Sequence, residues 1–171
     1  TVVVFYNSIQ DLISLKTDPT DGLLVFDNVD DVRAKGVEVE MEGKWHGGHE
    51  GRISYTMQEA ENEETGRPIE NSPKHLIKLN LIGALLREKV FFGIEEQYTS
   101  KRKTISGSFA DAFFITNLTV YTRNIFKTLE ISGSVYNVFD EKYDDPGDEA
   151  LFQDTIEQDG RTFRLKLTYA F

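Results

Sequence analysis

The sequence contains no cysteine and only three histidines. The absence of cysteine excludes a disulfide scaffold, a thiol nucleophile and a cysteine-based metal site. Three histidines argue against a histidine-based zinc site. Basic residues are also scarce, because 19 Lys and Arg stand against 29 Asp and Glu and give a net charge of −10. We do not expect so acidic a chain to bind nucleic acid as a partner.

Long apolar runs are missing as well. No stretch approaches the roughly 18 apolar residues of a transmembrane helix. Residues 1–13 lack the basic start and the cleavage site of a signal peptide. They already show the two-residue alternation of a strand. We therefore expect the chain to begin inside a strand, as a fragment or a trimmed small domain would. The mean hydropathy of −0.39 does not exclude a transmembrane barrel, because a barrel strand shows lipid only every second residue.

What the sequence does contain is two-residue alternation, and the clearest case is its end, GRTFRLKLTYAF at residues 160–171. Alternate side chains leave opposite faces of a strand, so this pattern predicts a strand with one apolar and one polar face. The apolar face consists of Phe163, Leu165, Leu167, Tyr169 and Phe171. The question is whether this face meets a protein core or lipid.

The whole chain reads as about eight strands with almost no helical period. Most are 11 residues or longer, whereas globular strands average about 5–6 residues and tilted membrane-crossing strands need about 9–11. The predicted strands are 2–15, 23–45, 52–58, 75–86, 90–100, 111–122, 128–139 and 160–171.

The connections between these strands alternate in length. Short turns at 46–49, 87–89 and 123–127 alternate with long loops at 59–73, 101–110 and 140–159. Outer-membrane barrels have short periplasmic turns and long external loops. The pattern therefore predicts an all-β, antiparallel transmembrane β-barrel.

Side-chain type supports the same interpretation. Polar residues on the predicted inward faces indicate a wet or plugged lumen; they are Glu38, Glu40, Arg52, Gln58, Lys78, Asn80, Glu130, Arg164 and Lys166. Aromatic residues near both strand ends indicate two interfacial girdles. The predicted girdles are Trp45, Tyr121, Phe126, Tyr169 and Phe171 near the short turns, and Tyr98, Phe109, Phe113 and Phe114 near the long loops.

Three segments resemble TonB-dependent outer-membrane receptors. RAKGVEVE (33–40) is similar to a family strand that contains a Gly-Val-Glu, here Gly36, Val37 and Glu38. GRPIENSPKH (66–75), with Pro73 and His75, is similar to a loop-to-strand passage of that family. SVYNVFDEKYDDPG (134–147) resembles the passage before the last strand, with Asn137, Phe139, Asp140 and Tyr143 at the typical places. The resemblance covers essentially the whole chain.

The resemblance implies that residues 1–171 are the C-terminal segment, about eight strands, of a barrel of about 22 strands closed by an N-terminal plug. The plug itself is not in the sequence. The intact protein would be a transporter in the bacterial outer membrane that imports a scarce nutrient, such as a ferric siderophore or cobalamin, with energy from the TonB complex acting on the plug. No catalysis and no cofactor are implied. The terminal aromatic strand resembles the signal read by the barrel-assembly machinery.

Two charged clusters lie on the predicted external loops. Residues 139–159 carry nine acids and one Lys. Asp144, Asp145, Asp148 and Glu149 could bind a divalent cation, although a solvated acidic loop is the simpler interpretation. Residues Arg67, Lys101, Arg102 and Lys103 form the basic group. This group could contact an anionic ligand or a lipopolysaccharide phosphate, or it could be an ordinary solvated loop.

Two alternatives to the receptor remain at the level of sequence. The first is a complete, eight-stranded outer-membrane barrel with a structural or adhesive role. The second is a soluble ligand-binding β-barrel, which would direct its apolar residues inward. An enzyme is not indicated, because no nucleophile and base can be connected, and Glu95 and Glu96 leave opposite faces of one strand.

Overall fold

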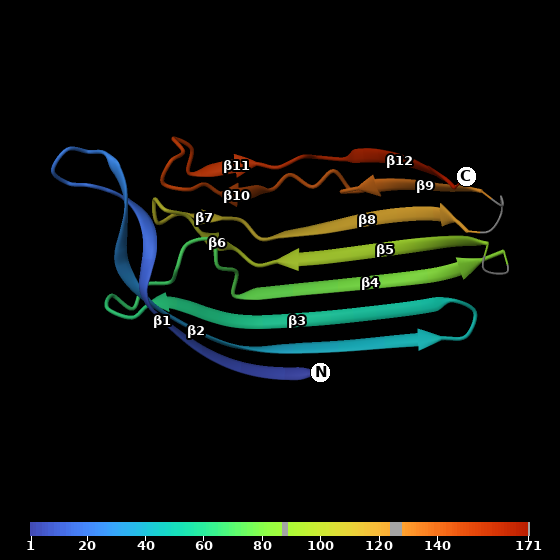
Figure 1. The fold of residues 1–171 in the computed structure, drawn as a ribbon, viewed down its shortest axis with the longest axis horizontal. Coiled ribbons are helices and arrows are strands. Elements are labelled where there is room, and N and C mark those ends of the chain that lie inside the picture. The colour runs from blue at the N-terminus through green and yellow to red at the C-terminus, as the bar shows by residue number, and fades with distance from the viewer. Residues whose placement is uncertain (87–88, 124–127, 171) are drawn as a thin grey trace.

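A computed structural model describes residues 1–86, 89–123 and 128–170 of the chain. Eight long strands form one antiparallel sheet in the order β1-β2-β3-β4-β5-β8-β9-β12, and two further sheets have two strands each (Figure 1). The long strands are β1 (Val2–Thr17), β2 (Leu24–Trp45), β3 (His49–Asn62), β4 (His75–Leu85), β5 (Val90–Thr99), β8 (Phe113–Thr122), β9 (Leu129–Tyr136) and β12 (Thr162–Tyr169). The short pairs are β6 (Arg102–Lys103) with β7 (Phe109–Ala110), and β10 (Asp144–Pro146) with β11 (Thr155–Glu157). No helix in the described part of the chain is long and apolar enough to cross a membrane.

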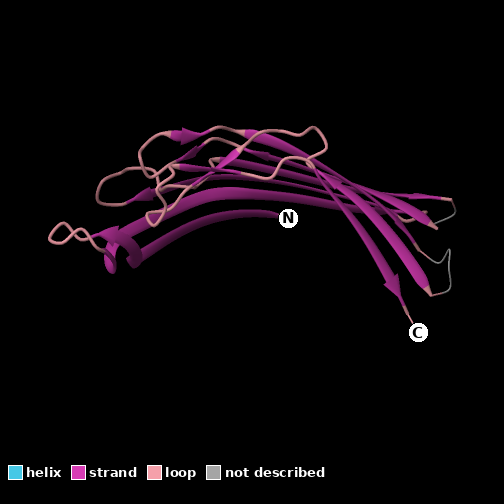
Figure 2. Ribbon diagram, turned by 90° about the horizontal axis from the view of Figure 1, so that it is seen from above, coloured by secondary structure: helices cyan, strands magenta, loops and turns pink. Residues whose placement is uncertain are grey.

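The sheet is open. Strands β1 and β12 form its two edges in the described residues, so the eight strands do not close into a barrel. Figure 2 shows the sheet as one curved layer. The all-β, antiparallel fold is as predicted, and each long strand pairs with its neighbour in the chain order.

Three predicted loops contain more structure than the sequence analysis assigned to them. Strand β3 continues through Asn62, so residues 59–62 are not loop. Two long loops hold the β6–β7 and β10–β11 ladders. The short segments were missed because a strand of two or three residues is too brief to show a period.

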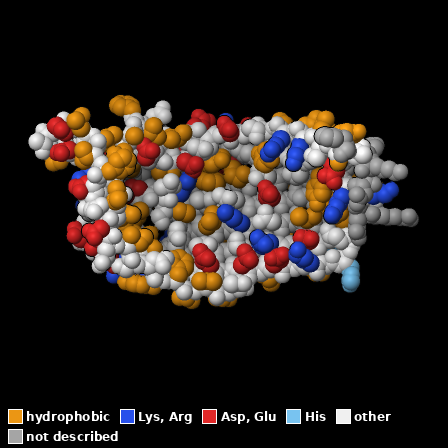
Figure 3. All heavy atoms as spheres, viewed as in Figure 1, with side chains coloured by type: hydrophobic (Ala, Val, Ile, Leu, Met, Phe, Trp, Pro, Cys, Tyr) orange, Lys and Arg blue, Asp and Glu red, His pale blue; other side chains and the backbone are white. Residues whose placement is uncertain are grey.

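The register separates two faces. One row across five neighbouring strands is apolar or aromatic and consists of Val39, Tyr55, Ile77, Tyr98 and Phe114. The adjacent row lies on the other face and is largely polar, with Glu40, Ser54, Lys78, Gln97 and Ile115. Charged side chains spread over the hollow side of the sheet in Figure 3, which has the view of Figure 1. We call this side the concave face and the opposite side the convex face.

The convex face is a band of exposed apolar side chains. Met41 is 69% exposed and Leu165 is 72% exposed. The described residues bury only four apolar residues, namely Val32, Phe91, Ala110 and Phe113. A water-soluble protein rarely leaves so large a contiguous apolar surface uncovered, whereas a barrel wall presents such a band to lipid.

Two positions depart from the predicted aromatic girdles. Phe113 and Tyr121 share the concave face with Gln97 and Asn117, and the ring of Tyr121 stacks on Phe91 with centroids 5.0 Å apart. They therefore do not belong to a lipid-facing girdle. Phe126 and Phe171 lie outside the described residues.

The apolar band of the convex face contains an acidic side chain, Glu96. Glu96 is opposite Leu79 and Thr116, and it accepts a hydrogen bond of 2.8 Å from the Thr116 hydroxyl. Glu95 points to the concave face next to Asn117. The two neighbouring carboxylates are thus separated by the sheet, as the alternation predicts.

Candidate functional site

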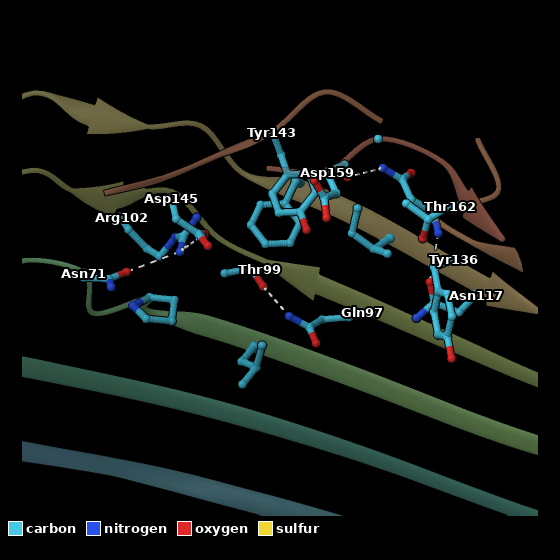
Figure 4. Close-up of a pocket in the computed structure, with 16 residues that line it drawn as sticks. Asn71, Gln97, Thr99, Arg102, Asn117, Tyr136, Tyr143, Asp145, Asp159 and Thr162 are labelled. Atoms are coloured by element: carbon cyan, nitrogen blue, oxygen red, sulfur yellow. Dashed lines mark hydrogen bonds and ion pairs between the residues drawn. The ribbon is translucent and has the colours of Figure 1, made fainter. Parts of the chain in front are cut away.

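A polar cavity of about 560 Å³ lies on the concave face at the long-loop end of the sheet (Figure 4). Its floor comes from adjacent strands and its upper wall from the long loops. The strand residues include Gln97 and Thr99 of β5, Asn117 of β8, Tyr136 of β9 and Thr162 of β12. These side chains share the cavity because concave-face residues of antiparallel neighbours lie side by side in the register.

Arg102 joins three loops at the upper wall of this cavity. Its Nη1 donates to Asp145 Oδ1 at 2.6 Å and to Asn71 Oδ1 at 3.2 Å, and its Nη2 donates to the Asp144 carbonyl at 2.8 Å. The residue is only 6% exposed. A buried guanidinium is tolerated when carboxylate and carbonyl groups compensate its lost hydration. Arg102 therefore fixes the loops rather than presenting a free cation.

Further contacts tie the same loops together. Lys103 Nζ lies 2.6 Å from Glu70 Oε1, and the Lys103 carbonyl accepts a hydrogen bond from the Asn71 amide. The Ser106 hydroxyl donates to Asp154 Oδ2 at 2.7 Å. Hydrogen bonds from Ser106, then from Thr104, hold the pKa of Asp154 below its ordinary value. Loops 63–74, 100–112 and 137–161 thus meet as one connected wall.

The Asn137 motif locks the last loop onto the sheet. Asn137 has a φ of 50° and is 4% exposed. Its amide donates to Asn117 Oδ1 at 2.9 Å, its Oδ1 accepts from the Glu141 amide at 2.8 Å, and its Nδ2 donates to the Glu141 carbonyl at 2.9 Å. Asparagine suits this place because it tolerates a left-handed backbone and bonds locally.

The two later residues of the motif extend the same contacts. Asp140 accepts a hydrogen bond of 2.7 Å from the Arg161 amide, which keeps the pKa of this carboxyl below its ordinary value. The Tyr143 ring packs on Phe113 with centroids 4.3 Å apart. Burial, and then the nearby Asp145 and Asp159, raise the pKa of Tyr143, so its phenol is neutral at pH 7. Phe139 is 72% exposed and does not enter this packing.

The other motif residues have separate positions. A Cβ at Gly36 would lie 2.4 Å from the Met57 carbonyl oxygen and 2.6 Å from the Phe5 ring, so glycine allows Phe5 to cover β2 there. Val37 and Glu38 lie on the convex and concave faces respectively, as their alternation predicts. Pro73 lines the cavity.

His75 lies on the convex face, in register with Met57 of β3. Its Nδ1 is 2.9 Å from the Tyr55 hydroxyl. The loop-to-strand motif therefore places Pro73 at the concave cavity and His75 on the opposite side of the sheet.

The predicted basic group is divided between the two faces. Arg102 lines the concave cavity, whereas Lys101 and Lys103 line a second cavity, of about 550 Å³, together with convex-face residues such as His75. Arg67 lines a third cavity, which also includes Lys103. The four residues therefore do not form one site.

The acidic loop does not gather its carboxylates. Asp145 pairs with Arg102, and no group of three or more His, Asp or Glu in the described residues could hold a metal ion. The concave cavity offers amide, hydroxyl and phenol groups beside two aromatic rings. Such a lining suits binding of a polar ligand through hydrogen bonds and ring contacts.

The sequence did not indicate five polar residues of the cavity, namely Gln97, Thr99, Asn117, Tyr136 and Thr162. A signal was available, because each is a polar residue on the inward face near the long-loop end of its strand. What the pattern could not supply was the register, which brings these residues of four strands together.

The terminal strand has the predicted alternation. Four apolar residues of this strand are 63–74% exposed on the convex face, namely Phe163, Leu165, Leu167 and Tyr169. Their partners on β9 are Val135, Gly133, Ile131 and Leu129. Phe171 lies outside the described residues.

Solved structures with a similar fold include several import receptors. The ferric-catecholate import receptor Fiu of E. coli K12 is 18% identical with a TM-score of 0.75, and the match covers 99% of this chain and 25% of Fiu. The pyoverdine receptor FpvA of Pseudomonas aeruginosa is 16% identical with a TM-score of 0.75, over 98% of this chain and 24% of FpvA. The copper transporter OprC is 18% identical with a TM-score of 0.76, over 99% of this chain and 28% of OprC.

The chain thus spans about a quarter of the length of these structures. A search of curated proteins found no match. The family model described as "TonB dependent receptor-like, beta-barrel" matches residues 1–138. Together with the open antiparallel sheet and its two contrasting faces, this match shows that the chain belongs to the TonB-dependent receptors of the Gram-negative outer membrane and carries strands of their β-barrel.

Proposed function

We propose that this chain forms part of the wall and outer loops of an active transporter that imports a scarce metal chelate, such as a ferric siderophore, or cobalamin. The observation that carries the proposal is the polar cavity on the concave face, beneath loops that Arg102 joins. In a closed barrel the concave face surrounds the lumen, so this cavity would open into the import path.

The roles of the cavity residues follow from their chemistry. Gln97, Asn117 and Tyr136 supply hydrogen-bonding groups from three different strands. Phe113 and Tyr143 supply a rigid aromatic surface. The tied loops hold this arrangement in place before a ligand arrives, which lowers the ordering cost of binding.

The remaining parts of the proposal concern partners. Residues 1–171 would be the C-terminal segment of the barrel domain, and a plug outside this sequence would contact the TonB complex. The strand from Phe163 to Phe171 would face lipid and carry the signal for the barrel-assembly machinery. The protein would move its ligand without catalysing a reaction.

The two alternatives fit the molecule less well. A complete eight-stranded barrel requires β1 and β12 to pair, whereas these strands are the edges of the sheet. A soluble ligand-binding barrel requires an apolar interior, whereas the concave face carries rows such as Glu40, Ser54, Lys78 and Gln97.

Uptake by cells that lack the gene tests the proposed function. Strains with and without the gene would be supplied with radiolabelled iron or cobalt on a panel of siderophores and cobalamin. We expect uptake of one class of chelate to require both the gene and a working TonB complex. Uptake that is unchanged by loss of the gene across the whole panel would contradict the proposal.

Variants test the location of the ligand. Replacing Gln97 or Tyr136 by Ala would weaken ligand binding by about tenfold, because each removes a hydrogen-bonding group from the cavity. Gln10→Ala is a matched control, since Gln10 is exposed on β1 and does not line the cavity. Equal losses in all three variants would place the ligand elsewhere.

A further inference from the structure

The second cavity, of about 550 Å³, lies beside the same loops at the ends of β3 and β4, and its lining residues Glu59, Glu61 and His75 belong to the convex face. We call it the convex groove and define it by Lys74, His75, Lys101, Lys103, Phe109 and Ile69, which are among its lining residues. Arg102 points to the concave cavity, and its two neighbours Lys101 and Lys103 line the convex groove. The groove is therefore a separate site, which the proposed transport function does not use.

The groove lies where the apolar band of the convex face ends. Its floor residue His75 is bonded to Tyr55, and Tyr55 is in the apolar row with Ile77, Tyr98 and Phe114. Phe114 is 50% exposed and Ile77 is 37% exposed. In a membrane this row lies against lipid chains, so the groove above it lies at the level of the headgroups.

The charge of the groove is opposite to that of the chain. Its lining residues and their ion-pair partners include five cations, Arg33, Lys35, Lys74, Lys101 and Lys103, against three carboxylates, Glu59, Glu61 and Glu70. This local excess of two positive charges occurs in a chain with a net charge of −10. An anion is therefore attracted to this part of the loops and repelled from most of the rest.

Among the described residues that line the groove, Lys101 is the cation without a carboxylate partner. Lys74 lies 2.7 Å from Glu59 and Lys103 lies 2.6 Å from Glu70. Within residues 1–86, 89–123 and 128–170, no carboxylate lies within ion-pair distance of Lys101, and its Nζ lies 4.6 Å from the centroid of the Phe109 ring. The aromatic ring holds the ammonium group at the rim of an apolar-lined groove.

We propose that the convex groove binds the phosphate-bearing headgroup of an outer-leaflet lipid, such as lipopolysaccharide, with Lys101 as the contacting cation. The apolar part of the lining, including Ile69 and the 54% exposed Phe109, contacts the start of the acyl chains. A lipid has a charged headgroup next to its acyl chains, and this face has a basic groove next to an apolar band, so the two match in sequence from headgroup to chains. Lys35 and Lys74 share the single carboxylate of Glu59, and the positive charge left over adds long-range attraction.

The test is a binding titration of the protein purified from outer membranes in detergent and washed free of lipid. The probe is lipid A with both phosphates, and the comparison probes are dephosphorylated lipid A and inorganic phosphate. We expect Lys101→Gln to weaken binding of the phosphorylated lipid by about tenfold. Lys101→Arg should restore most of the affinity, which separates a lost charge from a misfolded variant.

Lys16→Gln and Lys142→Gln are matched controls, because each removes one lysine charge from an ion pair outside the groove. They should change the affinity by less than about twofold. Wild-type affinity in Lys101→Gln, equal losses in the controls, or equal binding of dephosphorylated lipid would each overturn the proposal. Competition by millimolar inorganic phosphate would also overturn it, since the site would then take free phosphate. None of these outcomes depends on whether the protein transports a chelate.

Discussion

The two faces of the sheet differ although they are built from the same strands. Arg164 and Leu165 are neighbours in β12, but Arg164 lies opposite Ser134 on the concave face and Leu165 lies opposite Gly133 on the convex face. The same division continues in the loops, where Arg102 and Lys103 line different cavities. Whether a residue number is odd or even within its strand therefore predicts more about that residue's environment than its nearness in the chain to other residues does.

The largest effect should come from a charge placed on the convex face. Leu165→Arg puts a cation in the apolar band, and near a bilayer midplane this costs about 2–4 kcal/mol. Thr168→Arg is the control, because Thr168 lies on the concave face opposite Glu130. Urea unfolding in lipid vesicles measures both variants. Equal costs at the two positions would mean that the convex face does not contact lipid.

The neighbours Arg102 and Lys103 give a second comparison. Arg102→Ala removes the bonds to Asp145, Asn71 and the Asp144 carbonyl, and we expect a local loss of about 2 kcal/mol. Lys103→Ala removes an ion pair that lies nearer the surface and should cost less than about 1 kcal/mol. Amide hydrogen exchange in loop 137–161 measures the difference. Similar exchange in the two variants would contradict the central role of Arg102.

Two glycines on opposite faces differ in the space around them. Gly36→Ala would place a Cβ 2.4 Å from a backbone oxygen and 2.6 Å from the Phe5 ring on the crowded concave face, so we expect a loss of about 1–3 kcal/mol. Gly133→Ala meets nothing within 4 Å on the convex face and should be nearly neutral. Amide hydrogen exchange in β1 measures the effect of Gly36→Ala, and exchange in β9 measures the effect of Gly133→Ala. A neutral Gly36→Ala would show that Phe5 can move aside at no cost.

The smallest effect should be a dependence of loop order on pH. The pKa of Asp154 lies below its ordinary value of 3.8 in the folded state, because Ser106 donates hydrogen bonds to the carboxylate. The hydrogen bonds to Asp154 therefore stabilise the loop fully above pH 3.8. This stabilisation disappears as the pH falls through the lower pKa that Asp154 has in the folded state. Hydrogen exchange at Ser106 between pH 6 and about pH 3 should show this loss. Ser106→Ala should reduce the pH dependence, because the Thr104 hydroxyl and the residue 106 amide still bond the Asp154 carboxylate, and it should leave exchange in β4 unchanged.

Much of the fold follows from local pattern. Strands such as β4 and β12 are long enough to show a two-residue period, and the period assigns residues such as Lys166 and Leu167 to opposite faces. The Asn137 motif could also be found in the sequence, because its residues make local bonds to Glu141 and lie within one short segment. The brief strands β6 and β10 could not be found, since two or three residues show no period.

The candidate site was less accessible to prediction. Phe113 and Tyr121 lie near strand ends, which fits a lipid-facing girdle, but their parity directs them to the concave face. The sequence predicts one basic group of Arg67, Lys101, Arg102 and Lys103, whereas the structure distributes these residues among three cavities. For the basic group, a short separation along the chain was therefore not a short separation on one face.

Side-chain type and spacing within about a dozen residues are enough to specify the strand-rich class, the two chemically different faces and the short segments whose bonds are local. The tertiary arrangement sets which strand ends share a cavity and which cations are paired, and in the described part of the chain it leaves Lys101 without a carboxylate partner. These properties depend on register between strands and on contacts between loops as far apart as Asn71, Arg102 and Asp145. No local pattern encodes such distances.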